Sequence, residues 1–214
     1  MRFRDRAEAG RALAGLLSRL RERGDLAGPL LVLALPRGGV AVAEPVARAL
    51  GAPLDVLVVR KIGAPHHQEF AVGALAADDP PLFDADSLGH LGLTEDSLAA
   101  AVDREREELR RRERRYRGDR PPPDLKGRTV IVVDDGLATG ATARAALRHI
   151  RRRGPARLVL AVPVGAPDSL DSLATEADTV VCPHRPAAFA AVGQWYDDFE
   201  QLSDAQVVTA LRNT

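Results

Sequence analysis

Two adjacent carboxylates, Asp134 and Asp135, begin the stretch of this sequence that is richest in chemistry. A glycine-bearing run at residues 138–142 follows them, and a helical pattern begins there. Backbone N–H groups at a helix N-terminus bind phosphate, and the helix dipole favours negative charge. Carboxylates would repel a bare phosphate, but they accept hydrogen bonds from hydroxyl groups. The combination predicts a ligand that carries both groups, such as a ribose phosphate.

The surrounding elements would hold these groups in place. Residues 129–133 are β-branched and read as a buried parallel strand. Ala143, Ala146, Leu147 and Ile150 follow at helical spacing. In a simpler interpretation, the strand ends in Asp-Asp because it meets water, and Thr139 is an ordinary N-cap. That interpretation explains each feature singly, whereas a strand, a carboxylate pair and a glycine turn in one run favour a binding site.

A second turn with glycine and a charge, Pro36-Arg37-Gly38-Gly39, follows a strand predicted at residues 30–35. Arg60 and Lys61 end another predicted strand, at residues 54–59. Because α/β proteins bind ligands at the carboxyl ends of their strands, these cations should converge with the carboxylates. The alternatives are a tight turn that needs glycine and a solvated strand end.

Strands near residues 30, 54, 129, 158 and 178 alternate with helices, which predicts a five-stranded parallel sheet flanked by helices. We expect one α/β domain with a core at about 25–182 and an insertion at about 62–125. The insertion contains a hairpin, with strands at 70–75 and 82–83, and a long helix at 94–116. A C-terminal hood at about 183–214, together with an N-terminal helix that Asp5 caps, completes the domain.

Composition limits the function. The chain has 214 residues, with 45% hydrophobic and 28% charged residues, and its 30 basic residues balance 30 acidic ones. Zero net charge argues against binding nucleic acid by bulk electrostatics. A single cysteine, Cys182, fits a reducing cytoplasm. We see neither a secretory signal nor an apolar run long enough to span a membrane, so we expect a cytoplasmic protein.

The motif DDGLATGAT at residues 134–142 resembles the signature of type I phosphoribosyltransferases, which bind 5-phosphoribosyl-1-pyrophosphate (PRPP). The resemblance implies that the chain transfers a ribosyl 5-phosphate to a nitrogenous acceptor, releases pyrophosphate and uses Mg2+. It implies that Asp134 and Asp135 take the ribose hydroxyls, directly or through the metal. The 5-phosphate would be bound by Ala138, Thr139, Gly140, Ala141 and Thr142.

The resemblance also assigns the second loop. Pyrophosphate would be held by Arg37, Gly38, Gly39, Arg60 and Lys61, and a non-proline cis peptide would join Pro36 to Arg37. The hairpin would carry a mobile loop, on which Glu69 is the one acid available for proton transfer. His66 and His67 lack a nearby third metal ligand and read as a surface loop.

The acceptor is less defined. In 6-oxopurine enzymes of the family an aspartate precedes the Thr-Gly of the motif, and here Ala138 stands there, which argues against a hypoxanthine–guanine enzyme. Trp195 and Tyr196 form an aromatic cluster in the tail, which either stacks a planar acceptor or packs as a lid on the core. The alternative function is a PRPP-binding regulator without catalysis.

The long helix is dominated by charge. Nine arginines and six acids lie between residues 103 and 120, which is typical of a solvated helix with i,i+4 ion pairs. Covering the pyrophosphate and forming a dimer contact are the alternatives. From the resemblance we also expect a homodimer.

Overall fold

A parallel five-stranded sheet forms the centre of the molecule in the computed structural model, which describes residues 2–65 and 67–213. Its strand order is β2-β1-β6-β7-β8, with every neighbouring pair parallel. The strands are β1 (Leu30–Ala34), β2 (Leu54–Val56), β6 (Thr129–Val133), β7 (Arg157–Ala161) and β8 (Thr179–Val181). The predicted α/β fold is therefore confirmed.

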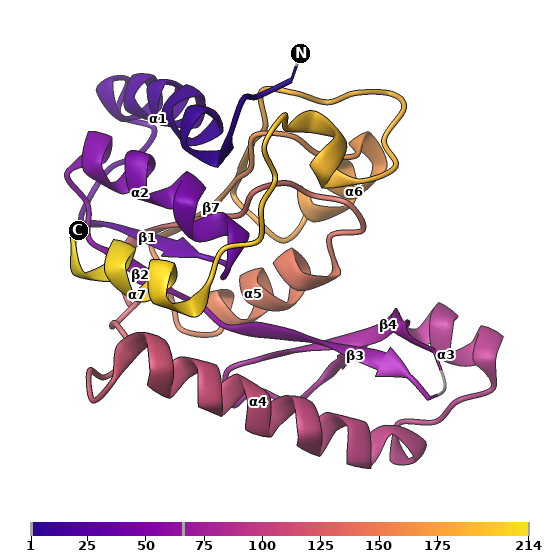
Figure 1. Cartoon of the computed structure of the whole chain (residues 1–214). Helices are drawn as coiled ribbons and strands as arrows, with labels where there is room; N and C mark the ends of the chain where they lie inside the picture. Colours follow the sequence, from indigo (N-terminus) through magenta and orange to yellow (C-terminus); the bar gives the residue numbers. More distant parts are fainter. Residues whose placement is uncertain (1, 66, 214) are drawn as a thin grey trace.

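Helices cover both faces of this sheet because its strands are apolar on both sides (Figure 1). Successive side chains of a strand point to opposite faces. Leu30 and Val32 of β1 accordingly pack in one core with α1 (Arg6–Glu22) and α2 (Gly38–Leu50). Leu31 and Leu33 pack in the other core, with α5 (Ala141–Arg151) and α6 (Pro167–Leu173).

The insertion forms an antiparallel three-stranded sheet that extends away from the central sheet (Figure 1). Its strands are β3 (Val59–Ala64), β4 (His67–Ala76) and β5 (Leu82–Phe83). The predicted hairpin corresponds to β4 and β5, in which Gly73 pairs with Phe83. The short helix α3 (Ala85–Leu91) and a 3-10 turn, η1 (Asp96–Leu98), lead into the long helix α4 (Ala99–Arg117). The long helix therefore begins later than predicted, and Thr94 does not cap it but accepts a hydrogen bond from the N–H of Ser97 in η1.

One predicted strand is wrong in its extent. Residues 54–59 do not form a single strand, because β1 ends at Ala34 and its carbonyl accepts the last parallel hydrogen bond from Leu57 N. The chain then enters β3, which pairs with β4 instead. Arg60 and Lys61 consequently lie inside a strand of the second sheet, and do not follow the end of β2.

The two ends of the chain meet beside the central sheet. Phe3 forms a parallel bridge with Tyr196, which follows the 3-10 turn η2 (Val192–Trp195). The last helix, α7 (Asp204–Arg212), packs Val207 and Leu211 into the core that α1 and α2 share. Within the described residues, no helix combines the length and the apolarity that a membrane span requires.

Candidate functional site

A cavity of about 820 Å³ lies where β1, β6, β3 and α4 approach one another. It brings together most of the polar residues singled out in the sequence. They are Arg37, Gly38, Arg60, Lys61, Asp134, Asp135 and Thr142. The sequence separation between Arg37 and Thr142 shows that the fold assembles this site from distant segments, as the convergence of strand ends predicts.

Asp134 and Asp135 follow β6 directly, and both residues line the cavity. Asp134 accepts a hydrogen bond from the N–H of Asp135 at 2.8 Å. Burial, together with the charge of Asp135, raises the pKa of Asp134 well above its usual value. Burial also raises the pKa of Asp135, against the opposing effect of Arg6. Two carboxylates held together out of bulk water are poised for hydrogen-bond donors or cations in a ligand.

Arg6, which the sequence did not single out, contacts this pair. Its Nε donates to Asp135 Oδ2 at 2.8 Å, and the two side chains are only 10% and 16% exposed. A second contact comes from the tail, because the hydroxyl of Tyr196 donates to the carbonyl of Asp135 at 2.6 Å. We call this group, Asp134 and Asp135 with Arg6 and Tyr196, the carboxylate end of the cavity.

The second loop adopts the predicted backbone. The peptide bond between Pro36 and Arg37 is cis. Both glycines make close approaches: a Cβ at Gly38 would lie 1.9 Å from Asp135 Oδ2, and one at Gly39 would lie 2.7 Å from the carbonyl oxygen of Val133. A side chain at Gly38 would displace the carboxylate of Asp135, and one at Gly39 would strike backbone, so the loop lies directly against the carboxylate pair.

Cations also line the cavity. We call Arg37, Arg60, Lys61, Arg104 and Arg112 the cationic wall. Arg60 Nη2 lies 2.7 Å from Glu105 Oε2, whereas Lys61 and Arg104 make no ion pair within the described part of the chain. Lys61 and Arg104 can therefore receive an anionic ligand without first losing an ion-pair partner.

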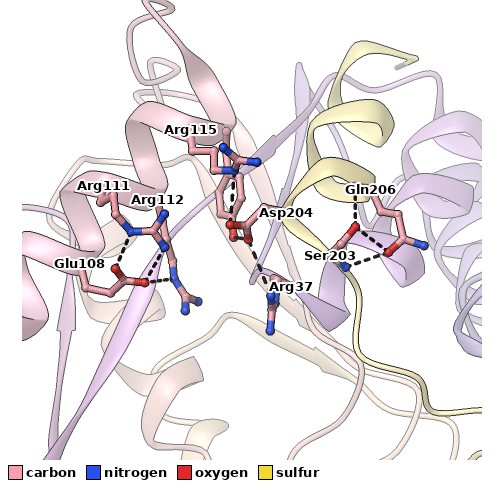
Figure 2. Close-up of polar contacts among 9 residues, drawn as sticks. Arg37, Glu108, Arg111, Arg112, Arg115, Ser203, Asp204 and Gln206 are labelled. Atoms are coloured by element: carbon pink, nitrogen blue, oxygen red, sulfur yellow. Dashed lines mark hydrogen bonds and ion pairs between the residues drawn. The ribbon is translucent and has the colours of Figure 1, made fainter.

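Two residues of this wall come from α4, so the helix is not simply solvated. Arg104 and Arg112 line the cavity, and Glu108 holds Arg112 Nε at 2.7 Å (Figure 2). The hydrogen bond from Arg111 to the same carboxylate, supported by Arg112, lowers the pKa of Glu108 to about 2. The i,i+4 ion pairs predicted for the helix are present, and the geometry also favours its role as a cover for the cavity.

Asp204, at the start of α7, connects this wall to the tail (Figure 2). Its carboxylate lies 3.8 Å from Arg37 Nη1 and 3.4 Å from Arg115 Nε, and it accepts a hydrogen bond from Tyr116 Oη at 2.7 Å. Burial and this bond to Asp204 raise the pKa of Tyr116 to about 12. Ser203 caps the helix and fixes Asp204 in its first turn. The tail therefore supports the second loop.

The predicted 5-phosphate loop borders two cavities. Thr142 lines the cavity described above, whereas Thr139 and Ala141 line a second one of about 620 Å³ between α5 and the second sheet. Lys61 lines both cavities. Gly140 is the N-cap of α5 in the left-handed conformation, and the first N–H groups of that helix lack carbonyl partners within it. The loop has the geometry of a phosphate cradle.

The aromatic cluster of the tail packs inward. Tyr196 is 1% exposed and lies against Phe3, so it is not a stacking surface for a ligand. Trp195 stacks on Phe189 and makes an edge contact with His184. Neither residue lines the two cavities. The lid interpretation of this cluster, and not the stacking one, matches the structure. Glu69, the candidate proton-transfer acid, has its side chain outside the described residues.

The sequence did not single out Arg6, Arg104 or Asp204 as site residues. Arg6 lies in an N-terminal stretch rich in arginine, and Arg104 is one of many arginines on α4. Asp204 looks like a residue of a capped helix start. A local pattern does not separate them from their neighbours, because their partners lie far away in the chain.

The donor set of the carboxylate end fits Mg2+ in one specific way. The described residues contain no group of three or more acidic, histidine or cysteine side chains able to enclose a metal. Mg2+ is usually bound by one or two carboxylates together with substrate phosphates and waters. Asp134 and Asp135 beside a phosphate loop match that arrangement, in which the substrate supplies the other oxygens.

The fold and the site define the class of protein. The family model described as "Phosphoribosyl transferase domain" matches residues 3–196, and the chain belongs to this family. The match includes the carboxylate end, the 5-phosphate loop and the cationic wall.

Individual relatives support this assignment. A Mycobacterium tuberculosis H37Rv protein provisionally named a phosphoribosyl transferase is 46% identical over 98% of this chain. The alignment covers 46% of that protein, so the chain spans about half the length of the curated relatives it matches. The crystal structure of the protein TT1426 from Thermus thermophilus superposes with a TM-score of 0.82 at 45% identity, covering 100% of this chain and 99% of that one. A uracil phosphoribosyltransferase from Kocuria rhizophila is 41% identical over 58 residues, 27% of this chain and 28% of that protein.

Proposed function

We propose that this protein transfers the 5-phosphoribosyl group of PRPP to a nitrogenous base or similar acceptor and releases pyrophosphate. One observation carries the proposal: a single cavity is lined by the carboxylate pair, by Thr142 of the 5-phosphate loop and by the cationic wall. PRPP needs these three features, because it carries hydroxyl groups between a phosphate and a pyrophosphate.

Each part of the donor has a candidate partner. Residues 138–142 would hold the 5-phosphate through backbone N–H groups and the threonine hydroxyls. Asp134 and Asp135 would accept hydrogen bonds from the ribose hydroxyls. Arg37, Lys61 and Arg60 would bind the pyrophosphate, with the N–H groups of Gly38 and Gly39.

The chemistry needs positioning more than covalent participation. When the bond between C1 of the ribose and the pyrophosphate breaks, positive charge develops on the sugar and negative charge on the departing group. The carboxylate end would lie beside the sugar and stabilise the positive charge, while the cationic wall would stabilise the negative charge. Mg2+, bound through substrate oxygens beside Asp134 and Asp135, would add charge neutralisation to the pyrophosphate.

We further propose a nucleobase-like acceptor, action in nucleotide metabolism in the cytoplasm, and a homodimer. Ala138 lies where the 6-oxopurine enzymes have an aspartate, so hypoxanthine and guanine are not the acceptors we expect. Its carbonyl accepts a hydrogen bond from Ser169 Oγ, which ties this part of the loop to α6.

A regulator that binds PRPP without catalysis is the second candidate. The observation that favours it is the absence of aromatic side chains among the described residues lining the larger cavity, which leaves no stacking surface there for a planar acceptor. Phe70 and Phe83 line the smaller cavity instead.

The deciding experiment incubates the protein with PRPP, Mg2+ and single purine and pyrimidine bases, and follows pyrophosphate release. Turnover with one base establishes the transferase. Tight PRPP binding without turnover on any base establishes the regulator. The double variant Asp134→Asn, Asp135→Asn tests the carboxylate end. We expect its affinity for PRPP to fall by at least about 10-fold, because two charge-assisted hydrogen bonds are weakened. Unchanged PRPP binding by that variant would refute the assignment of the carboxylate end.

A further inference from the structure

Arg6, in the first turn of α1, is held more firmly than a surface arginine. Its Nε donates to Asp135 Oδ2 at 2.8 Å and its Nη1 donates to the carbonyl of Glu200 at 2.8 Å. The guanidinium carbon also lies 3.8 Å from the centre of the Phe199 ring. A planar guanidinium with partners in its plane and an aromatic ring on its face has little freedom to turn.

We propose that Arg6 is a positioning residue that aims Asp135 at the ribose hydroxyls of the donor, and that the two ends of the chain form the frame that holds Arg6. The inference rests on the proposed function, because it presupposes that the ligand of Asp135 carries hydroxyl groups.

The frame is built from backbone hydrogen bonds between residues 3–4 and 195–198. Phe3 N donates to Trp195 O, Asp197 N donates to Phe3 O and Asp198 N donates to Arg4 O, each at 2.8 Å. These bonds fix the start of α1 against the tail that carries Phe199 and Glu200. The same tail contacts Asp135 directly, since Tyr196 Oη donates to its carbonyl. Both the side chain and the backbone of Asp135 are therefore fixed from the chain ends.

The contact with Arg6 gives Asp135 a partner that differs from those of Asp134. Arg6 donates to Oδ2 of Asp135 and thereby fixes the direction in which the other oxygen, Oδ1, points. The cation also offsets the charge of one of two adjacent acids, which otherwise repel each other. Gly38 completes the arrangement, because a Cβ there would lie 3.1 Å from Arg6 Nε and 1.9 Å from Asp135 Oδ2. Glycine at position 38 thus leaves the room in which Arg6 and Asp135 meet.

The test separates ligands by their hydroxyl groups. Affinities for PRPP, ribose 5-phosphate and inorganic pyrophosphate are measured by titration calorimetry on the whole chain, for the wild type, Arg6→Met and Arg6→Lys. We expect Arg6→Met to bind PRPP and ribose 5-phosphate roughly 10-fold more weakly, because a mispositioned acceptor loses a charge-assisted hydrogen bond. Pyrophosphate, which the cationic wall binds, should keep its affinity within about twofold. The affinities of Arg6→Lys for PRPP and ribose 5-phosphate should lie between those of the wild type and Arg6→Met, since an ammonium lacks the forked donors that reach Asp135 and Glu200 together.

Arg4→Met is the matched control, because Arg4 lies in the same segment and its side chain is 69% exposed and pairs with the neighbouring Asp5. It should bind the three ligands as the wild type does. Wild-type PRPP affinity in both Arg6 variants would overturn the inference, as would tighter binding, which would mean that Arg6 competes with the ligand.

An equal loss of affinity for pyrophosphate would also overturn the inference, because it would indicate general disruption of the site. If Arg6→Met does not fold, Arg6→Lys alone decides through its ratio of PRPP to pyrophosphate affinity. A wild-type protein that binds pyrophosphate but not PRPP would instead refute the proposed function. That result is visible before any variant is made.

Discussion

The carboxylate end and the cationic wall lie in one cavity but are constructed differently. At the carboxylate end, Asp135 is contacted by Arg6 at 2.8 Å and by Tyr196 at 2.6 Å. The two glycines of the second loop lie so close to Asp135 and to the end of β6 that a Cβ at either position would clash. At the cationic wall, the ion pair of Arg37 with Asp204 is 3.8 Å long, and Lys61 has no ion pair within the described residues. The carboxylate end is preorganised. The wall is mixed, because Arg60 and Arg112 are each paired at 2.7 Å whereas Lys61 stays available for a ligand.

The proposed function gives this difference a reason. Ribose hydroxyls are neutral and their hydrogen bonds are directional, so their acceptors would have to be fixed beforehand. A pyrophosphate would arrive with PRPP and leave again, and a cation without a close internal partner, such as Lys61, could follow it with little reorganisation. Changes at the carboxylate end should therefore affect geometry and stability, and changes at the wall should affect affinity in a salt-dependent manner.

The largest effect is expected from Gly39→Ala, which tests the rigid end. A Cβ there would lie 2.7 Å from Val133 O and 3.0 Å from Asp134 Cα, and backbone atoms of a central strand cannot move aside cheaply. We expect the free energy of unfolding to fall by about 1–3 kcal/mol, and PRPP binding to be lost, as measured by denaturant melts and calorimetry.

Gly15→Ala is the control for that substitution. Gly15 lies within α1, and a Cβ there would have nothing within 4 Å. Alanine should leave PRPP binding unchanged and raise stability by roughly 0.5–1 kcal/mol, because glycine is a poor helix former. If Gly39→Ala behaves like Gly15→Ala, the carboxylate end is not rigid.

A middle-sized effect is expected from Lys61→Ala, which tests the wall. Loss of a charged hydrogen-bond donor should weaken PRPP and pyrophosphate binding by roughly 10-fold, with the folded state unaffected. The difference in affinity between the wild type and the variant should shrink as salt concentration rises, because salt screens the attraction between the Lys61 ammonium and the phosphates. Lys126→Ala, at the other lysine of the chain, is the control and should change nothing. Equal losses at low and high salt would show that Lys61 acts through packing.

The smallest effect is expected from Asp204→Asn, which tests the support of Arg37. The carboxylate is 20% exposed and its contact with Arg37 is long. We therefore expect a change in pyrophosphate and PRPP affinity of only about two- to fivefold, as for partly exposed ion pairs. Asp197→Asn, whose side chain is 62% exposed and pairs with Arg2, should leave both affinities unchanged. A loss at Asp204 as large as that at Lys61 would contradict the description of the Arg37–Asp204 contact as weak.

Much of the site was predictable because it is local in sequence. The strand, the carboxylate pair and the helix start occupy residues 129–143, and their order along the chain sets their order in space. The cis bond between Pro36 and Arg37, which the family resemblance implied, is confirmed by the structure. The strand at 54–59 was predicted with the wrong extent, because its end depends on where its neighbour β1 stops and not on its own residues.

The sequence by itself determined the five-stranded sheet, the two loops and the class of ligand that they suit. Only the tertiary structure decided that Arg6 forms a hydrogen-bonded ion pair with Asp135, 129 residues away, and that Asp204 lies beside Arg37. It also decided that Tyr196 is buried and supports the backbone of Asp135, and is not a stacking surface for a ligand. The physical reason is that hydrophobic periodicity and turn chemistry act between near neighbours, whereas the partner of a charged side chain is chosen by whichever distant segments the packed core brings beside it.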